Sequence, residues 1–430
     1  MNICMFTNTY LPHVGGVARS VNTFARDLRK KGHRVRIIAP EFPGWQDHDL
    51  NEPDIVRVPA LTEFNGSGFS VRIPVPFYLD EAVDDFAPQV IHSHHPYLLG
   101  DAAIRAARRR RLPLVFTHHT LYEAYAHHIK MDFDSFRQFA ARLSTRYANL
   151  CDRVVAPSRS IARMLSNRGV ETKIAPVPTG IDIAFFASGD GETFRRRHGI
   201  AKEAPVLGHV GRLAPEKNLK FLTRAALSAV NQIPESVFLV VGEGPDRGTV
   251  RNIFKEAGAA DRLKLPGELS GQDLSDAYQA MDLFAFSSLT ETQGMVLAEA
   301  MAAGTPVAAL NAPGVREVVD HGANGVLLHP DTDEKGVAQV LAELLSNPQT
   351  RSRMGAEALK TAREYSREAS VDKLIRLYRD VDPGRNGRTL DYGDDIAPWE
   401  TLMLGLQTEW DLLTQKTSTL VDTIQTHGQP

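Results

Sequence analysis

The chain has 430 residues, of which 43% are hydrophobic and 23% are charged. That length predicts two domains of ordinary size, because one compact hydrophobic core rarely serves so many residues. The formal net charge of −3 at pH 7 provides no general attraction to nucleic acid, so no nucleic-acid partner is expected and an anionic ligand needs a local cluster of cations.

The composition also indicates the compartment. Cys4 and Cys151 are the two cysteines, which allows one disulfide at most and favours a reducing environment. Residues 1–7 are apolar but lack a basic region and a small-residue cleavage site, so they predict a first strand and not an export signal. No stretch approaches the roughly 20 apolar residues of a membrane-spanning helix. We therefore expect a cytoplasmic protein, with any membrane contact peripheral and on the inner face of the cell membrane.

Short apolar runs alternate with helical patterns through the first part of the chain, and the alternation then starts again. The first series of runs covers residues 2–7, 34–39, 90–92, 114–117 and 153–156. The second series covers residues 206–211, 237–241, 262–265, 283–286 and 306–309. Strand, crossover helix and strand in this order is typical of a parallel sheet. The α/β fold that we predict is therefore two facing Rossmann-like domains, each a doubly wound parallel sheet that binds ligands at the carboxyl ends of its strands.

The domain boundaries follow from composition. We place an N-terminal Rossmann-like domain at residues 1–180, a linker rich in proline, glycine and charge at 181–205, and a C-terminal Rossmann-like domain at 206–365. A closing helix at 366–382 is expected to return to the N-terminal domain. Residues 383–430 are a helical extension outside both domains.

The extension has an apolar stripe. Its members recur at three- and four-residue steps and are Trp399, Leu402, Met403, Leu406, Trp410 and Leu413. This spacing predicts an amphipathic helix whose apolar face needs a partner surface. Glu400, Glu409 and Asp411 disfavour an anionic bilayer as that partner. We expect burial against protein, with a homo-oligomer through this tail preferred over docking on the chain's own domain.

A pair of glycines, Gly15 and Gly16, follows the first predicted strand and precedes a helix from about Ala18. Glycines let the backbone approach a ligand closely, and the amides at a helix N-terminus attract an anion such as a diphosphate. A tight turn without a ligand fits this loop equally well. The G-x-G-x-x-G spacing of dinucleotide-binding folds is absent, which disfavours a dehydrogenase.

Four charged residues follow strands of the second series. Arg212 and Lys217 come after the run 206–211, whereas Glu291 and Glu299 come after the run 283–286. Two carboxylates can hold hydroxyl-bearing groups, and two cations can neutralise a diphosphate leaving group without a metal ion. Each residue alone could be an ordinary surface charge. Their joint position at strand ends of one domain predicts a site for a nucleotide diphosphate.

Three segments together resemble family 4 of the retaining glycosyltransferases, which have the GT-B fold. They are GRLAPEKN at 211–218, VGEGP at 241–245, and Glu291 followed after seven residues by Glu299. The resemblance covers residues 1–380 approximately, and the combination of motifs is specific for the superfamily. It implies transfer of a hexose from a nucleotide diphosphate sugar, with retention of the anomeric configuration.

The resemblance also implies roles for individual residues. Arg212 and Lys217 would clamp the diphosphate, Glu291 would bind hydroxyls of the hexose, and His119 would lie beside the sugar. Glu299 would bind the ribose. The full set of donor-binding residues that it implies is Gly15, Gly16, Gly211, Glu243, Gln293, Gly294, Met295 and Glu299.

A shorter segment, residues 122–129, is similar to bacterial glucosyltransferases that act on diacylglycerol. It implies Tyr122, Tyr125 and His127 on the acceptor side, although Ala124 stands where an acidic residue is expected. The favoured reaction is then transfer of glucose from UDP-glucose to a diacylglycerol or glycolipid. The alternatives are a hexosyltransferase for a soluble sugar or sugar phosphate, an epimerase of nucleotide sugars, and a nucleotide-sugar sensor or scaffold that is not an enzyme.

Histidines and arginines raise two further possibilities. The histidines at positions 92, 94, 95, 118, 119, 127 and 128 suggest zinc, but no H-E-x-x-H pattern, cysteine cluster or convincing D-x-D site accompanies them. We expect no metal requirement and no cofactor besides the nucleotide sugar as co-substrate. The arginines at 105 and 108–111 end a predicted helix, where cations are favoured by the helix dipole, and an anionic-lipid contact is the alternative.

Overall fold

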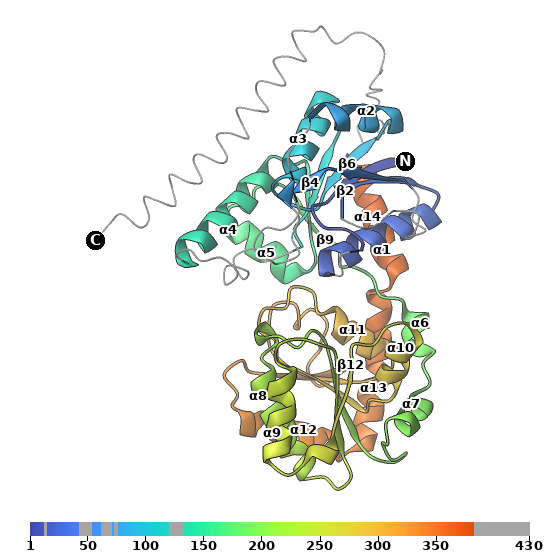
Figure 1. The fold of residues 1–430 in the computed structure, drawn as a ribbon, viewed down its shortest axis with the longest axis vertical. Coiled ribbons are helices and arrows are strands. Elements are labelled where there is room, and N and C mark those ends of the chain that lie inside the picture. The colour runs from blue at the N-terminus through green and yellow to red at the C-terminus, as the bar shows by residue number, and fades with distance from the viewer. Residues whose placement is uncertain (13–14, 43–53, 62–70, 73–75, 120–132, 382–430) are drawn as a thin grey trace, which may run out of the picture. The chain divides into compact units, whose positions relative to one another are not determined.

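The computed structural model describes residues 1–12, 15–42, 54–61, 71–72, 76–119 and 133–381. They form two compact units, which are described separately below (Figure 1). Of the described residues, the N-terminal unit contains those of Met1–Thr179 and those from Ser370 to Val381, and the C-terminal unit is Gly180–Ala369.

The N-terminal unit is built on a seven-stranded parallel sheet with the order β3-β2-β1-β6-β7-β8-β9. Its strands are β1 (Asn2–Phe6), β2 (Arg34–Pro40), β3 (Ile55–Val58), β6 (Val90–Ser93), β7 (Leu114–Thr117), β8 (Arg153–Ala156) and β9 (Ile174–Pro176). A separate antiparallel pair consists of β4 (Ala60–Leu61) and β5 (Val71–Arg72). The helices of this unit are α1 (Gly16–Lys30), α2 (Pro76–Phe86), α3 (Leu99–Arg109), α4 (Phe133–Asn149), α5 (Arg159–Asn167) and most of α14 (Arg367–Val381).

Both faces of this sheet are buried. Along β1, Cys4 and Phe6 join one hydrophobic cluster, whereas Ile3 and Met5 join a second one. Successive side chains of a strand point to opposite faces, so each face of β1 has its own apolar cover. A strand that is buried on both sides must be apolar throughout, which explains the uninterrupted run at the start of the sequence.

Helix α14 completes the second of these clusters. Leu374 and Tyr378 are fully buried among the residues that also pack on Ile3 and Met5. The Tyr378 hydroxyl lies 2.5 Å from Nδ1 of His92 at the end of β6. Figure 1 shows this helix, in orange, among the blue elements of the N-terminal unit. The last described helix is therefore part of the core that the first strand begins.

The C-terminal unit has a six-stranded parallel sheet with the order β12-β11-β10-β13-β14-β15. Its strands are β10 (Val206–Val210), β11 (Val237–Val241), β12 (Leu263–Gly267), β13 (Leu283–Phe286), β14 (Val307–Leu310) and β15 (Gly325–Leu328). Its α-helices are α6 (Ile183–Ala187), α7 (Gly191–Arg197), α8 (Leu219–Asn231), α9 (Arg247–Glu256), α10 (Gly271–Gln279), α11 (Met295–Ala302), α12 (Glu334–Leu345) and α13 (Pro348–Glu364). Two short 3-10 helices are η3 (Pro215–Lys217) and η4 (Ala260–Arg262).

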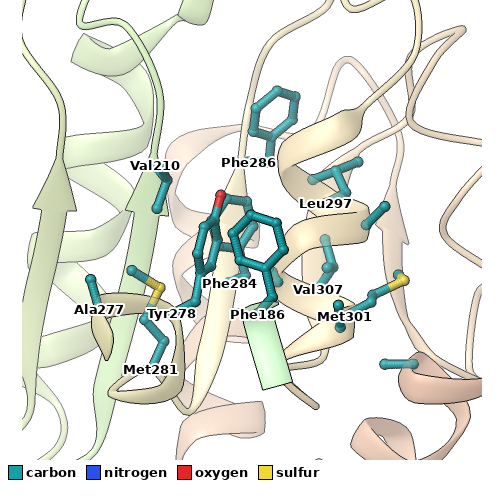
Figure 2. Packing of buried hydrophobic residues seen from close by; sticks show 14 of the residues in the cluster. Phe186, Val210, Ala277, Tyr278, Met281, Phe284, Phe286, Leu297, Met301 and Val307 are labelled. Atoms are coloured by element: carbon teal, nitrogen blue, oxygen red, sulfur yellow. The ribbon is translucent and has the colours of Figure 1, made fainter. Parts of the chain in front are cut away.

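The segment 181–205, which its composition suggests as a linker, carries α6 and α7. Figure 2 shows Phe186 of α6 packed beside Tyr278 and Phe284 in the core of the C-terminal unit. The rings of Phe186 and Tyr278 meet edge to face with centroids 5.3 Å apart, a favourable aromatic geometry. In α7, the Arg195 guanidinium lies 2.8 Å from the Asp282 carboxylate. Both helices thus pack with the unit that follows them.

The predicted fold class, two Rossmann-like parallel-sheet domains, is confirmed. All ten predicted strands are present; four have the expected ends, and the ends of the other six differ by one or two residues. The unpredicted members of the two sheets, β3, β9 and β15, are edge strands. Edge strands tolerate proline, and Pro176 interrupts the apolar pattern of β9. The expected helix in residues 383–430 lies outside the described residues. No helix among the described residues is both long and apolar enough to cross a bilayer.

The role of α14 leads to a test with two leucines. Leu374→Ala should lower the free energy of unfolding by about 2–5 kcal/mol, because it leaves a cavity in a fully buried position. The matched control is Leu359→Ala in α13, whose side chain is 38% exposed, and its effect should be within about 0.5 kcal/mol. Urea unfolding measures the loss, and hydrogen exchange assigns it to β1 and β6. Equal effects of the two substitutions would contradict the assignment of α14 to this core.

Candidate active site

The loops after β10 and β11 are packed backbone to backbone. The Leu213 amide donates to the Glu243 carbonyl at 2.8 Å, and the Asp246 amide donates to the Leu213 carbonyl at 2.9 Å. A Cβ atom on Gly242 would lie 1.9 Å from the carbonyl oxygen of Gly211. Only glycine fits there, and its φ of +139° is also one that other residues rarely adopt. The GRLAPEKN and VGEGP segments therefore form one structural element at the strand ends.

The two predicted cations lie in and beside η3. Arg212 is exposed and forms an ion pair with Glu216. Lys217 is half-buried, and its Nζ atom lies 3.0 Å from Oε2 of Glu291. It also lies over the ring of Phe286, 5.9 Å from the centroid. The structure thus brings together a cation and a carboxylate that are 74 residues apart in the chain.

Glycine also determines how α11 begins. Gly294 has a φ of +70° and precedes Met295, the first residue of the helix. The Gly294 amide lies 3.5 Å from Oε1 of Glu291, and the Gly314 amide donates to the Glu291 carbonyl at 2.9 Å. The first amides of a helix have no acceptor within the helix, so this end favours an anion. The region from Glu291 to Met295, including Gln293, thus combines a carboxylate with a helix N-terminus.

Glu299 is placed deeper than its position in the sequence suggests. Its side chain is 6% exposed, and Oε2 accepts a hydrogen bond of 2.7 Å from the hydroxyl of Tyr278. A buried carboxylate requires strong hydrogen bonds, and a hydroxyl that donates to a charged oxygen provides one. Tyr278 was not predicted. A tyrosine among the apolar positions of α10 was the available signal, because buried tyrosine hydroxyls usually have a partner.

Two further residues that the sequence reasoning missed are Ser287 and Ser288, directly after β13. Both are buried, and their hydroxyls donate to the carbonyls of Lys217 at 2.9 Å and Glu216 at 3.1 Å. These bonds hold η3 beside the end of β13, which is what allows Lys217 to reach Glu291. Adjacent serines after a buried strand were a signal, but their acceptors lie some 70 residues away in the chain.

In the N-terminal unit, Gly15 and Gly16 lie where the glycine loop was expected. Gly15 is the N-cap of α1 in an extended conformation, and Gly16 is the first residue of the helix. A Cβ atom on Gly16 would have no neighbour within 4 Å, so packing within the chain does not require glycine at this position. An exposed helix start without a side chain leaves room for a ligand to approach.

A histidine cluster lies at the ends of β6 and β7. Nδ1 of His94 and Nε2 of His119 are 2.8 Å apart. His92 is held on both sides, because its Nε2 lies 2.7 Å from the Thr117 hydroxyl and its Nδ1 contacts the Tyr378 hydroxyl. His94 is fully buried, whereas His119 is partly exposed.

These imidazoles are neutral. Burial lowers the pKa of His92 and of His95 to about 3. It also lowers the pKa of His94 and of His119 well below the ordinary value, and the neighbouring histidines contribute in the same direction. A neutral imidazole offers one donor and one acceptor nitrogen. Among the residues that the structure describes, no group of three histidine, cysteine or acidic side chains is arranged to hold a metal ion.

The remaining predicted residues either lie outside the described residues or form ion pairs within the chain. Tyr122, Tyr125 and His127 lie outside the described residues. Glu243 forms an ion pair with Arg247 at the start of α9. In the arginine run, Arg110 is paired with Asp80 and Asp84 of α2, and its side chain is only 7% exposed. These ion pairs indicate that Arg110 stabilises the packing of α2 beside the end of α3, and they disfavour a contact of Arg110 with lipid.

The two Rossmann-like sheets, with cations and carboxylates gathered at strand ends of the second, define a glycosyltransferase of the GT-B class. A solved structure with this fold is that of HepE from Anabaena in complex with UDP. It superposes with a TM-score of 0.72 at 21% identity, and the match covers 88% of this chain and 100% of that one.

Comparison of sequences then gives the family. The model described as Glycosyltransferase Family 4 matches residues 14–185, and the model described as Glycosyl transferases group 1 matches residues 190–361. A GDP-mannose-dependent alpha-mannosyltransferase of Mycolicibacterium smegmatis is 30% identical over 385 residues, covering 89% of this chain and 98% of that protein. An alpha-monoglucosyldiacylglycerol synthase of Acholeplasma laidlawii is 25% identical over 393 residues, covering 89% and 97%. The chain belongs to glycosyltransferase family 4, as its motifs indicated, and it is an enzyme.

The neutral histidines lead to a prediction about acid stability. Unfolded histidine binds a proton below a pKa of about 6.5, whereas His92 and His95 in the folded state stay neutral down to about pH 3. Stability is therefore complete above pH 6.5 and falls as the pH drops below it. At pH 5.5 these two residues together should cost about 3 kcal/mol relative to pH 7.5.

Urea unfolding at both pH values measures the whole loss, to which His94 and His119 also contribute. His95→Asn keeps an acceptor for the Asn8 amide, which lies 3.0 Å from Nδ1 of His95, but removes the titrating group. It should reduce the pH-dependent loss by about half of that figure. His329→Asn is the control, because the His329 side chain is 75% exposed. If His95→Asn and wild type lost the same stability on acidification, the buried neutral state of His95 would be wrong.

Proposed function

We propose that this protein is a retaining hexosyltransferase that moves a hexose from a nucleoside diphosphate sugar to an acceptor hydroxyl without a metal ion. The observation that carries the proposal is the cluster at the strand ends of the C-terminal unit. There Lys217 pairs with Glu291, and Glu299 is fixed by Tyr278 one turn into α11. A diphosphate, a hexose and a ribose are the three groups that such a set of charges suits.

The cations neutralise the leaving group. Arg212 and Lys217 are each paired with a carboxylate in this structure. A diphosphate carries more charge than one carboxylate, so it displaces Glu216 and Glu291 as the cations' partners. Glu291 is then available to accept hydrogen bonds from hexose hydroxyls. Donor binding thus gives both cations a new partner in the diphosphate and gives Glu291 a new partner in the hexose.

The transfer itself needs few protein groups. The acceptor oxygen forms a bond to the anomeric carbon on the face from which the diphosphate departs, and the bond from that carbon to the phosphate oxygen breaks. The departing phosphate takes the proton of the acceptor hydroxyl. Lys217, Arg212 and the amides at Gln293, Gly294 and Met295 stabilise the charge that develops on the phosphate.

The N-terminal unit provides the other groups in this proposal. By family resemblance, Gly15 and Gly16 approach the phosphates and His119 hydrogen-bonds the donor sugar. The neutral state of His119 suits that role, since a neutral imidazole binds an uncharged hydroxyl without adding charge. The acceptor would bind on the same unit.

We favour UDP-glucose as donor and a diacylglycerol or glycolipid as acceptor. The similarity to the Acholeplasma laidlawii synthase and the resemblance at residues 122–129 support this version. A lipid acceptor also implies peripheral contact with the inner face of the cell membrane. The second candidate is mannosyl transfer from GDP-mannose, which the higher identity to the Mycolicibacterium smegmatis enzyme favours.

A donor panel tests the proposal. The full chain is incubated with UDP-glucose, UDP-galactose, GDP-mannose or ADP-glucose, each with dioleoylglycerol vesicles or with a soluble sugar phosphate. Released nucleotide and the glycosylated product are measured together. UDP release with a new α-linked glucolipid is expected. GDP release with a mannosylated product would replace the first version by the second, and an inverted β-linkage would overturn the assignment of retention.

Removal of one cation tests the site. Lys217→Ala should lower kcat by about 10²–10³-fold, because it removes a positive charge from the developing diphosphate. The control is Lys220→Ala, an exposed lysine on the first turn of α8, which should leave kcat unchanged. Circular dichroism verifies that both variants fold. Similar kcat values for Lys217→Ala and the control would contradict the proposed clamp.

Metal removal tests the leaving-group chemistry. Turnover with the donor identified by the panel should be unchanged, within twofold, in excess EDTA, because cations and helix amides replace a divalent ion. The same assay after dialysis against EDTA, with and without added Mg²⁺ or Mn²⁺, makes the measurement. Activity that disappears on chelation and returns with either metal would refute metal independence.

A further inference from the structure

The tautomer of His119 can be inferred from its neighbour His94. The two rings are nearly parallel, with an angle of 27° and centroids 5.1 Å apart, and the short contact between them joins Nδ1 of His94 to Nε2 of His119. One of these nitrogens must carry the hydrogen and the other must accept it, because both rings are neutral. The question is which of the two donates.

The surroundings of Nε2 of His94 determine which of the two rings donates. Nε2 of His94 is buried and has no hydrogen-bond partner among the residues that the structure describes. If Nε2 carried the hydrogen, a buried N–H would be left without an acceptor. Buried N–H groups without a partner are rarer than buried acceptors that lack a donor. The hydrogen of His94 is therefore favoured on Nδ1, where it has His119 as its acceptor.

The position of His94 is fixed from several sides. Its backbone amide donates to the Phe6 carbonyl at 2.9 Å, and its ring lies 4.2 Å from that of His92. His92 is itself held between Thr117 and Tyr378. The titratable neighbours that act on the pair are His92, His95 and His118, and each of them disfavours an added positive charge.

We propose that His94 is a positioning residue that donates from Nδ1 to Nε2 of His119 and so holds His119 in the Nδ1–H tautomer. His119 then offers its ligand a hydrogen-bond donor and has no free lone pair to act as a base. Its ligand is an oxygen with available lone pairs, as on a sugar hydroxyl. This role as a sugar-binding group rests on the proposed function, whereas the tautomer itself does not.

Nuclear magnetic resonance tests the tautomer without any substrate. The full chain is labelled with ¹⁵N-histidine, and long-range ¹H–¹⁵N spectra at pH 7.5 show which ring nitrogens carry hydrogen. The His94 and His119 signals are assigned with His94→Phe and His119→Gln. The expected result is a protonated Nδ1 and an unprotonated Nε2 for both residues. A hydrogen on Nε2 of His119, or a charged ring, would overturn the proposal.

Two substitutions of His94 separate positioning from packing. His94→Asn keeps a donor near the position of Nδ1, whereas His94→Phe keeps a ring of similar size without one. The Nδ1–H tautomer of His119 should persist in the asparagine variant and become a mixture in the phenylalanine variant. If His94→Phe leaves the tautomer unchanged while circular dichroism shows a folded chain, His94 does not set it.

Turnover with UDP-glucose adds the functional measurement. His94→Phe should lower kcat roughly tenfold, the size of one neutral hydrogen bond, and His94→Asn should lower it less than about threefold. The Nδ1–H tautomer together with no transfer from any donor in the panel would refute the proposed function alone. Normal transfer together with an Nε2–H tautomer would refute this inference alone.

Discussion

The close approach of Gly242 to the carbonyl of Gly211 is the constraint on which the charged cluster of the C-terminal unit depends. It brings the loops after β10 and β11 into backbone contact, and the Leu213 and Glu243 bond extends that contact. Ser287 and Ser288 then tie η3 to the end of β13. Lys217 reaches Glu291 only because both loops are fixed in this way. The charged groups of the site are thus positioned mainly by backbone contacts.

The polar groups of the two units lie in opposite electrostatic environments. The C-terminal unit keeps its charges paired and partly exposed, as with Lys217 and Glu291, so that an incoming anion can exchange partners with them. The N-terminal unit keeps its polar groups buried and uncharged, as with His92 and His94. A leaving group with high charge needs the first environment, whereas an uncharged sugar ring needs hydrogen bonds of defined direction and no competing ions. The division fits the proposed roles of the two units.

Much of the fold could be predicted from the sequence because the central strands are buried on both faces. The run at β13 is apolar at every position, and the runs at β1 and β7 are apolar except for Asn2 and Thr117 at one end, which no solvent-facing strand requires. The edge strand β9 has no such pattern and was not predicted. Charged site residues stood out because they gather in the segments that follow β10 and β13. Tyr278 and Ser287 did not stand out in the sequence. A hydroxyl becomes part of a site only through its hydrogen-bond partner, and a single sequence does not reveal a partner that is distant in the chain.

The return of α14 to the first sheet has a consequence for biosynthesis. Tyr378 and His92 are 286 residues apart in the chain, and Leu374 covers the face of the sheet that Ile3 and Met5 begin. N-terminal domains usually fold first as the ribosome releases them. Here α1 covers part of that face early, but the part under α14 stays uncovered until the whole C-terminal unit has been translated. The nascent chain therefore exposes this part of its apolar surface while residues 180–369 are synthesised, and exposed apolar surface on an incomplete chain favours aggregation.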